Sequence, residues 1–187
     1  MHINDENKYF GAAQIGIRKH SVNQIINFCL NSKIEEAPYL ALMYCFATVD
    51  LMGAYLTGRF NERKETDNAF QFINKYIGYS REQTLLLQEI YRHKLVHTGL
   101  PTSFFKHNEE VFTWTIHYDN RNFHLKITEN GQARCFNISI RDFGQDLING
   151  MIKYLDELEV NDCLKQKYKK TLHELWGLNL IQEQNKV

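Results

Sequence analysis

The sequence has no excess charge of either sign, almost no proline and no paired cysteines. Its 22 Lys and Arg residues balance 22 Asp and Glu residues, which excludes binding to nucleic acid through overall charge. The four cysteines form no CxxC motif and have no short spacing to a histidine, so we expect reduced, buried thiols. No phosphate-binding loop, GxGxxG, GxSxG or HExxH motif occurs, which argues against the chemistries that those motifs support.

No repeat, linker or low-complexity tract divides the 187 residues, so we predict a single domain over 1–187. The predicted fold class is α+β, mainly α. An antiparallel helical bundle covers about 14–100 and 141–178, and a three-stranded antiparallel β-meander over about 110–140 is inserted before the last long helix. A polar tail follows over 182–187.

Start and stop signals divide the helical parts. Ser21 and Gln24 have the spacing of a capping box, which predicts that a short helix begins there. Pro38 fits the first turn of a long apolar helix. Gly58 is predicted to end that helix, and a third helix covers about 65–76. The fourth helix is predicted to begin at Ser80 and to end at Gly99. The last long helix is predicted to begin at Asp142, with a break at Asn161-Asp162.

The apolar segment Ala37–Thr57 is long enough to cross a membrane. Asp50 lies near its middle, and an Asp at membrane depth costs about 3 kcal/mol. We therefore predict a helix buried in the bundle rather than a membrane span. Residues 1–7 contain neither a basic nor an apolar signal region, so we expect a cytoplasmic protein without membrane contact.

Apolar residues alternate with polar ones between about 110 and 140, which predicts strands. A turn at Asn130-Gly131 would pair Leu125 with Phe136. A second turn, at Asn120-Arg121, would pair Tyr118 with Phe123. Both registers put the apolar side chains on one face, which the helices must cover. The predicted face comprises Phe112, Trp114, Ile116, Tyr118, Phe123, Leu125, Ile127, Phe136, Ile138 and Ile140.

The fourth predicted helix carries an Arg-x4-His motif, with His93 directly after Arg92 and with His97 at its end. This motif resembles that of the HEPN superfamily, helical domains found in many prokaryotic ribonucleases of toxin and antiphage systems. The resemblance covers about residues 37–160 and includes the apolar helix that contains Asp50. The β-meander departs from the minimal family plan, so the family's partner and substrate preferences do not transfer directly.

The resemblance implies a homodimer in which two Arg/His motifs share one cleft and cleave RNA without a metal or another cofactor. The RNA 2′-hydroxyl attacks the adjacent phosphodiester and leaves a 2′,3′-cyclic phosphate. An arginine fork matches phosphate oxygens and keeps its proton, so Arg92 would stabilise the phosphorane. Histidine titrates near neutrality, which gives His97 the acid/base role, with His93 in support.

Positive charge gathers around the motif. No acidic residue occurs between Glu89 and Glu109, so we assign phosphate binding to Lys94, Lys106 and His107. Basic residues in the last turn of a helix are also ordinary capping chemistry, which is the alternative interpretation. Five residues on an ideal helix turn through about 140°, so Arg92 and His97 do not share a face, unless the helix loosens, Arg92 reaches around or a dimer completes the pair.

Asp50 is the only formally charged residue between Glu36 and Arg59. A buried carboxylate requires a cation or strong donors, so we predict that Asp50 lies near Arg92 and orients it. The alternative is an exposed Asp50 on a polar strip beside Thr57. His117 and His124 are predicted to face each other on the polar side of the sheet, but no third metal ligand is evident, and we assign no metal site.

The leading hypothesis is therefore a homodimeric, metal-independent endoribonuclease of a toxin or antiphage-defence system. Its partners would be RNA and a cognate antitoxin protein. The alternative is a catalytically inactive module that binds RNA, a nucleotide or a protein and keeps the motif for packing.

Overall fold

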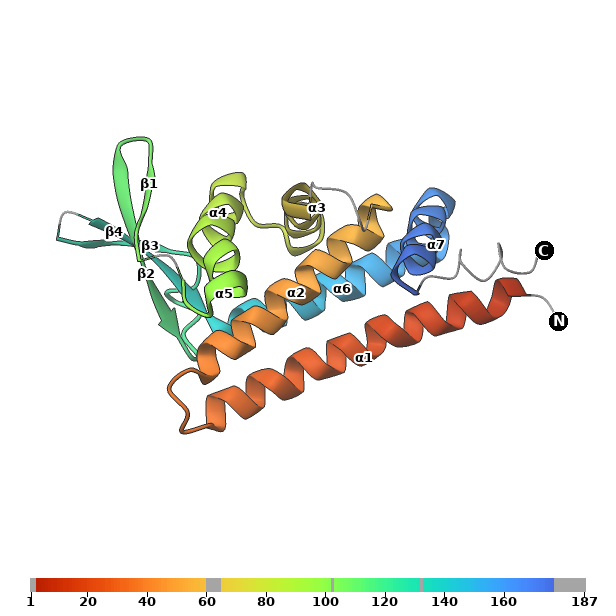
Figure 1. The fold of residues 1–187 in the computed structure, drawn as a ribbon, viewed down its shortest axis with the longest axis horizontal. Coiled ribbons are helices and arrows are strands. Elements are labelled where there is room, and N and C mark those ends of the chain that lie inside the picture. Colours follow the sequence, from red (N-terminus) through yellow and green to blue (C-terminus); the bar gives the residue numbers. More distant parts are fainter. Residues whose placement is uncertain (1–2, 60–64, 102, 132, 177–187) are drawn as a thin grey trace.

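The computed structural model describes residues 3–59, 65–101, 103–131 and 133–176. It is mainly helical with one small sheet, as the α+β prediction requires (Figure 1). The predicted tail over 182–187 lies outside the described residues. The elements are α1 (Ile3–Asn31), α2 (Ala37–Thr57), α3 (Glu65–Phe72), the π-helix η1 (Ile73–Ile77), α4 (Arg81–Leu86), the π-helix η2 (Leu87–Arg92), α5 (His93–Thr98), β1 (Phe105–His107), β2 (Glu110–His117), β3 (Ile127–Asn130), β4 (Ala133–Ser139), α6 (Ile140–Val160) and α7 (Asp162–Trp176).

Helix α1 is longer than predicted, because it begins at Ile3 and continues through Ser21 without a break. The proposed capping box at Ser21 is therefore wrong. Ile15, Val22 and Ile26 are all buried, and their spacing keeps one apolar face directed at the bundle on both sides of Ser21. Packing of that face outweighs the local cap signal. Figure 1 shows that α1 lies beside α2 near the loop that joins them and extends beyond the end of α2.

Helix α2 occupies the centre of the bundle and has the predicted bounds. Pro38 lies in its first turn, and Gly58 ends it in a left-handed conformation with φ of 72°. The helix is long and apolar enough to cross a membrane, but 61% of its most apolar window is buried inside the protein. That burial is the behaviour expected of a core helix. Phe46 packs on Phe143 of α6 with ring centroids 5.1 Å apart.

Gly53 allows α2 and α3 to lie in direct contact. A Cβ atom at this position would lie 2.5 Å from the backbone carbonyl of Asn68, much closer than two such atoms can approach. The side-chain amide of Asn68 also donates to the carbonyl of Arg59 at 2.8 Å. The missing side chain at position 53 therefore fixes how closely α3 covers the second half of α2.

The sheet differs from the predicted antiparallel meander. Four strands lie in the order β1-β2-β4-β3, and β2 pairs with β4 in parallel. Ile127, not Leu125, lies opposite Phe136, a shift of two residues that keeps the same face inward. Leu125 has a left-handed φ of 57°, so it ends the predicted strand, and Phe123 stays 41% exposed.

The segment between β2 and β3 is a crossover connection rather than a hairpin. It carries the chain past β4, which then occupies the place beside β2. The N–H of Leu125 donates to the carbonyl of Asn137, and the N–H of Asn137 donates to that of Lys126. Strand β1, which the sequence pattern did not indicate, pairs with β2 through a tight turn at Asn108 and Glu109.

The helical segment from Arg81 to Thr98 carries the motif and has the predicted ends. Ser80 and Gln83 form a capping box, and Gly99 ends the segment with φ of 76°. Its middle, Leu87–Arg92, is π-helical, a conformation frequent at functional sites. The predicted break at Asn161 is also present, because α6 ends at Val160 and α7 begins at Asp162.

Three cysteines are buried as predicted (Cys29, Cys45 and Cys135), whereas Cys163 in the first turn of α7 is exposed. Burial raises the pKa of the Cys45 thiol to about 12, so this thiol is unreactive. Cys163 lies at the bend between α6 and α7 and is exposed.

Candidate functional site

Asp50 and Arg92 form the closest ion pair between α2 and the motif. The Nε of Arg92 donates to Oδ1 and Oδ2 of Asp50 at 2.8 and 3.1 Å, and Nη2 donates to Oδ2 at 3.0 Å. The prediction that the two side chains lie together is confirmed. A bidentate pair of this kind fixes the guanidinium plane as well as its position.

Arg92 keeps donors that Asp50 does not use. A guanidinium has five N–H groups, and the pair with Asp50 engages Nε and one side of Nη2. Both N–H groups of Nη1 and one of Nη2 remain for another acceptor. The exposed fractions of the two side chains are 12% for Arg92 and 27% for Asp50, so most of the Arg92 side chain is covered by the protein.

His93 and His97 lie one turn apart on α5, and both are exposed. Their ring centroids are 5.6 Å apart with an interplanar angle of 70°. The helix loosens in the residues that end at Arg92, whereas the turn from His93 to His97 is regular α-helix. Among the described residues no hydrogen bond joins Arg92 to His97. Lys94, between the two histidines in the sequence, is also exposed.

His107, which we predicted to bind phosphate together with Lys94 and Lys106, lies away from the motif. His107 lines a cavity together with Arg81 and Leu85, at the start of the motif-bearing segment. Leu85 precedes His97 by twelve residues, which is about 18 Å along a helix. The hairpin of β1 and β2 carries Lys106 and His107 toward the beginning of α4, because β1 pairs with β2 rather than continuing from the end of α5.

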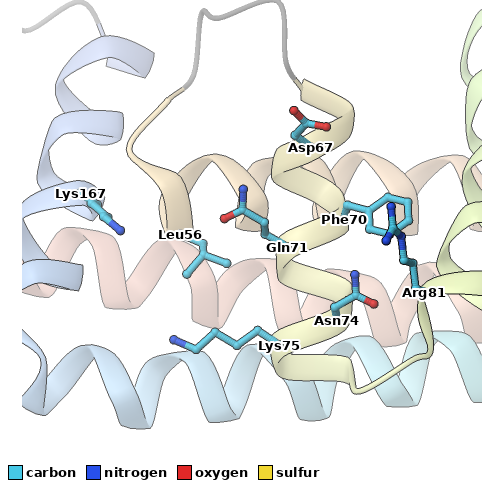
Figure 2. A pocket seen from close by; sticks show the side chains of 8 residues that line it. All are labelled: Leu56, Asp67, Phe70, Gln71, Asn74, Lys75, Arg81 and Lys167. Carbon is cyan, nitrogen blue, oxygen red and sulfur yellow. The ribbon is translucent and has the colours of Figure 1, made fainter.

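Two cavities bear on the site, a smaller one next to Asp50 and a larger one away from the motif. One of about 330 Å³ has Arg18, Asp50 and Arg59 in its wall, so it adjoins the carboxylate that holds Arg92. A larger one, of about 910 Å³, lies between α3, η1 and α7. Figure 2 shows its lining, in which Lys167 and Lys75 approach from opposite elements. None of the predicted site residues lines the larger cavity.

A second polar cluster, which the sequence analysis missed, joins the crossover connection to α6. The N–H of Ser139 donates to Nδ1 of His124 at 3.1 Å, so the ring carries its proton on Nε2. Nε2 lies 3.0 Å from the hydroxyl of Tyr79, and that hydroxyl donates to Asp146 at 2.9 Å. Arg121 donates to both oxygens of Asp146 at 3.0 Å.

The electrostatics of this cluster are those of a buried network with Arg121 at its surface edge, where 62% of that side chain is exposed. Burial acts to raise the pKa of the Asp146 carboxyl, but hydrogen bonds from His124, Tyr79 and Arg121 outweigh it and hold that pKa below its ordinary value. Burial, together with the charge of Asp146, raises the pKa of Tyr79 well above its ordinary range. No local sequence signal could have found this cluster, because its members come from four separate segments.

His117 and His124 do not face each other. Nε2 of His117 lies 3.0 Å from the side-chain oxygen of Asn137, whereas His124 is directed toward Tyr79. Strand β2 ends at His117, so His124 lies outside the strand, in the crossover connection. Within residues 3–59, 65–101, 103–131 and 133–176, no group of three His, Cys, Asp or Glu residues could hold a metal ion.

Comparisons with protein-family models, curated proteins and solved structures find no match to this chain. The resemblance to the HEPN superfamily therefore stays a prediction. The site therefore contains the guanidinium of Arg92, held in place by Asp50, the solvent-exposed imidazoles of His93 and His97, and the exposed Lys94. Such groups can hold an anion and exchange a proton with it.

Proposed function

We propose that the protein is a HEPN-like, metal-independent endoribonuclease that works as a homodimer in the cytoplasm. The observation that carries the proposal is the bidentate pair of Arg92 with Asp50, one turn before the exposed His97. Asp50 holds the guanidinium in one orientation and leaves N–H groups for a phosphate. This is the preorganisation that stabilises a charged transition state.

In the proposed reaction the RNA 2′-oxygen forms a bond to phosphorus, and the bond from phosphorus to the 5′-oxygen breaks. Arg92 donates to the non-bridging oxygens, where negative charge develops. His97 of one protomer takes the proton of the 2′-hydroxyl, and the symmetry-related His97 gives a proton to the departing 5′-oxygen.

The dimer is part of the proposal, because five residues on an ideal helix turn through about 140°, so Arg92 and His97 of one chain would not share a face. A two-fold axis near α5 would let each Arg92 meet the His97 of the other chain. His93 and Lys94 would then lie on the rim of the shared cleft. A toxin or antiphage-defence role would pair such an enzyme with a cognate antitoxin protein.

The test is incubation of the purified protein with mixed RNAs in excess chelator, followed by mapping of the new ends. We expect 2′,3′-cyclic phosphate and 5′-hydroxyl ends, and a loss of at least about 100-fold in rate for Arg92→Ala and for His97→Ala. Arg81→Ala and His20→Ala are matched controls, because both residues are exposed and lie outside the motif. Equal cleavage by all four variants, or no cleavage by the unaltered protein, refutes the proposal.

One observation favours the second candidate, an inactive module that binds RNA, a nucleotide or a protein. Only 12% of the Arg92 side chain is exposed, so the pair with Asp50 also joins α2 to η2 as a packing contact. If packing is its whole role, Arg92→Ala lowers the free energy of unfolding or the dimer affinity, and no RNA cleavage is detected in any variant.

A further inference from the structure

His93 and His97 have the geometry of a chelating pair. They are four residues apart on regular α-helix, so both side chains lie on one face. Both are exposed, and their ring centroids are 5.6 Å apart. Within the described part of the chain, neither ring has a hydrogen bond or an ion pair, so both ring nitrogens of each are open to a ligand.

The distance fits a shared metal ion. Zinc binds an imidazole nitrogen at about 2.0–2.1 Å, so two rings on one tetrahedral ion have centroids about 5 Å apart. The observed 5.6 Å is only slightly wider, and the planes already differ by 70°. A small rotation of exposed side chains would therefore bring two nitrogens onto one ion. Paired histidines four residues apart on a helix are also the spacing that zinc proteases use.

The residues around His93 and His97 determine which metal ion binds and how many protein ligands it has. No third His, Cys, Asp or Glu of the described residues joins the pair, so water must fill the other positions. Two neutral nitrogen donors favour a borderline cation over Mg²⁺ or Ca²⁺, which take oxygen ligands. We propose that His93 and His97 bind one zinc-class divalent cation per protomer, at an open site with two water ligands.

Occupancy of this site has a consequence that rests on the proposed function. The ion takes the nitrogen lone pair that His97 needs to accept a proton, so zinc would inhibit RNA cleavage rather than support it. Protons compete with the metal for the same nitrogens, so binding weakens in acid. The proposed enzyme would thus need no metal and be switched off by one.

The binding test uses the full chain carrying Cys163→Ser, since an exposed thiol is itself a zinc ligand. Metal is removed first, and ZnCl₂ is titrated by calorimetry at neutral pH. We expect one ion per protomer, and at least tenfold weaker binding for His93→Gln and for His97→Gln. His20→Gln is the matched control, an exposed helical histidine on α1, and should bind as tightly as the parent.

Circular dichroism of each variant establishes that the fold is kept before the titrations are compared. Unchanged affinity in both His93→Gln and His97→Gln, or a loss in only one of them, overturns the proposal. If the unaltered protein cleaves RNA, half-inhibition should occur at the zinc concentration that half-fills the site. If it never cleaves RNA while binding follows the expected pattern, the proposed function fails and the metal site stands.

Discussion

The two polar clusters of this protein use the same kinds of side chain and differ in how completely they are satisfied. Around His124, the ring, the Tyr79 hydroxyl and the Asp146 carboxylate form a continuous chain of hydrogen bonds inside the fold. Around His97, the rings face solvent, and Arg92 keeps unused donors. Each cluster has an Arg–Asp pair, so the difference lies in the histidines. The His124 ring uses both nitrogens inside the fold, whereas His93 and His97 have no hydrogen bond among the described residues.

The difference separates structural from chemical roles more clearly than residue type does. A fully paired network resists change, because each buried group that loses a partner bears a desolvation penalty. A partly paired one is available for binding.

The largest effect is expected from Asp146→Ala. The change leaves Tyr79 and His124 buried without their common acceptor, so the free energy of unfolding should fall by about 3 kcal/mol. Urea unfolding followed by circular dichroism measures it. Asp119→Ala is the control, because Asp119 and its partner Arg141 are both more than half exposed and should contribute at most about 0.5 kcal/mol. A loss below about 1 kcal/mol for Asp146→Ala would contradict the buried-network description.

Asp50→Ala should have an intermediate effect, about 2 kcal/mol, because it leaves Arg92 mostly buried without its acceptor. The same change in an Arg92→Ala background should cost much less, since the guanidinium that Asp50 holds is already gone. A double-mutant cycle by urea unfolding measures the coupling. RNA cleavage, if present, should fall more than tenfold in Asp50→Ala. Additive losses of stability would show that the pair contributes nothing as a unit.

Acid should weaken the buried network by a smaller amount. Because the folded pKa of Asp146 lies below its ordinary value, the unfolded chain takes up a proton first as the pH falls through about 4. The stability that this carboxylate contributes is complete above that pH and is lost below it. The stability difference between the unaltered protein and Asp146→Asn should therefore shrink between pH 6 and pH 3. A difference that does not depend on pH would contradict this assignment.

The smallest effect is expected from Tyr154→Phe. Among the described residues, the buried hydroxyl of Tyr154 has no hydrogen-bond partner, so its removal should change the free energy of unfolding by less than about 1 kcal/mol. Burial, together with the nearby Tyr168, raises the pKa of Tyr154. Above pH 10 the unfolded chain ionises first, so the variant should lose less stability there. A large loss at pH 7 would reveal a hidden partner.

Helix ends and the central ion pair could be predicted because each has a local cause. Pro38, Gly58, Ser80 and Gly99 mark boundaries through their own backbone chemistry. A single carboxylate in an apolar helix needs a cation, which led from Asp50 to Arg92. The error at Ser21 shows the limit of this approach. A helix continues through a capping sequence when its buried apolar face extends on both sides of that sequence.

The sheet and the buried network could not be predicted for a different reason. Alternating side chains determine which face of a strand is buried but not which strand lies next to it. The parallel pairing of β2 with β4 depends on a left-handed turn at Leu125, a residue that rarely adopts that conformation. His124 reaches Tyr79 and Asp146 only after this turn is made, so the cluster depends on tertiary structure alone.

Gly53 has a consequence for any attempt to alter the region around Asp50. A methyl group at position 53 would act as a wedge, because the atoms it meets belong to the backbone of α3 and cannot rotate away. Asn68, on the displaced helix, shares a cavity wall with Asp50. The size of that cavity therefore depends on the absence of a Cβ atom at position 53. Even the methyl group of alanine would displace α3 and change the shape of the cavity, although position 53 is not in its wall.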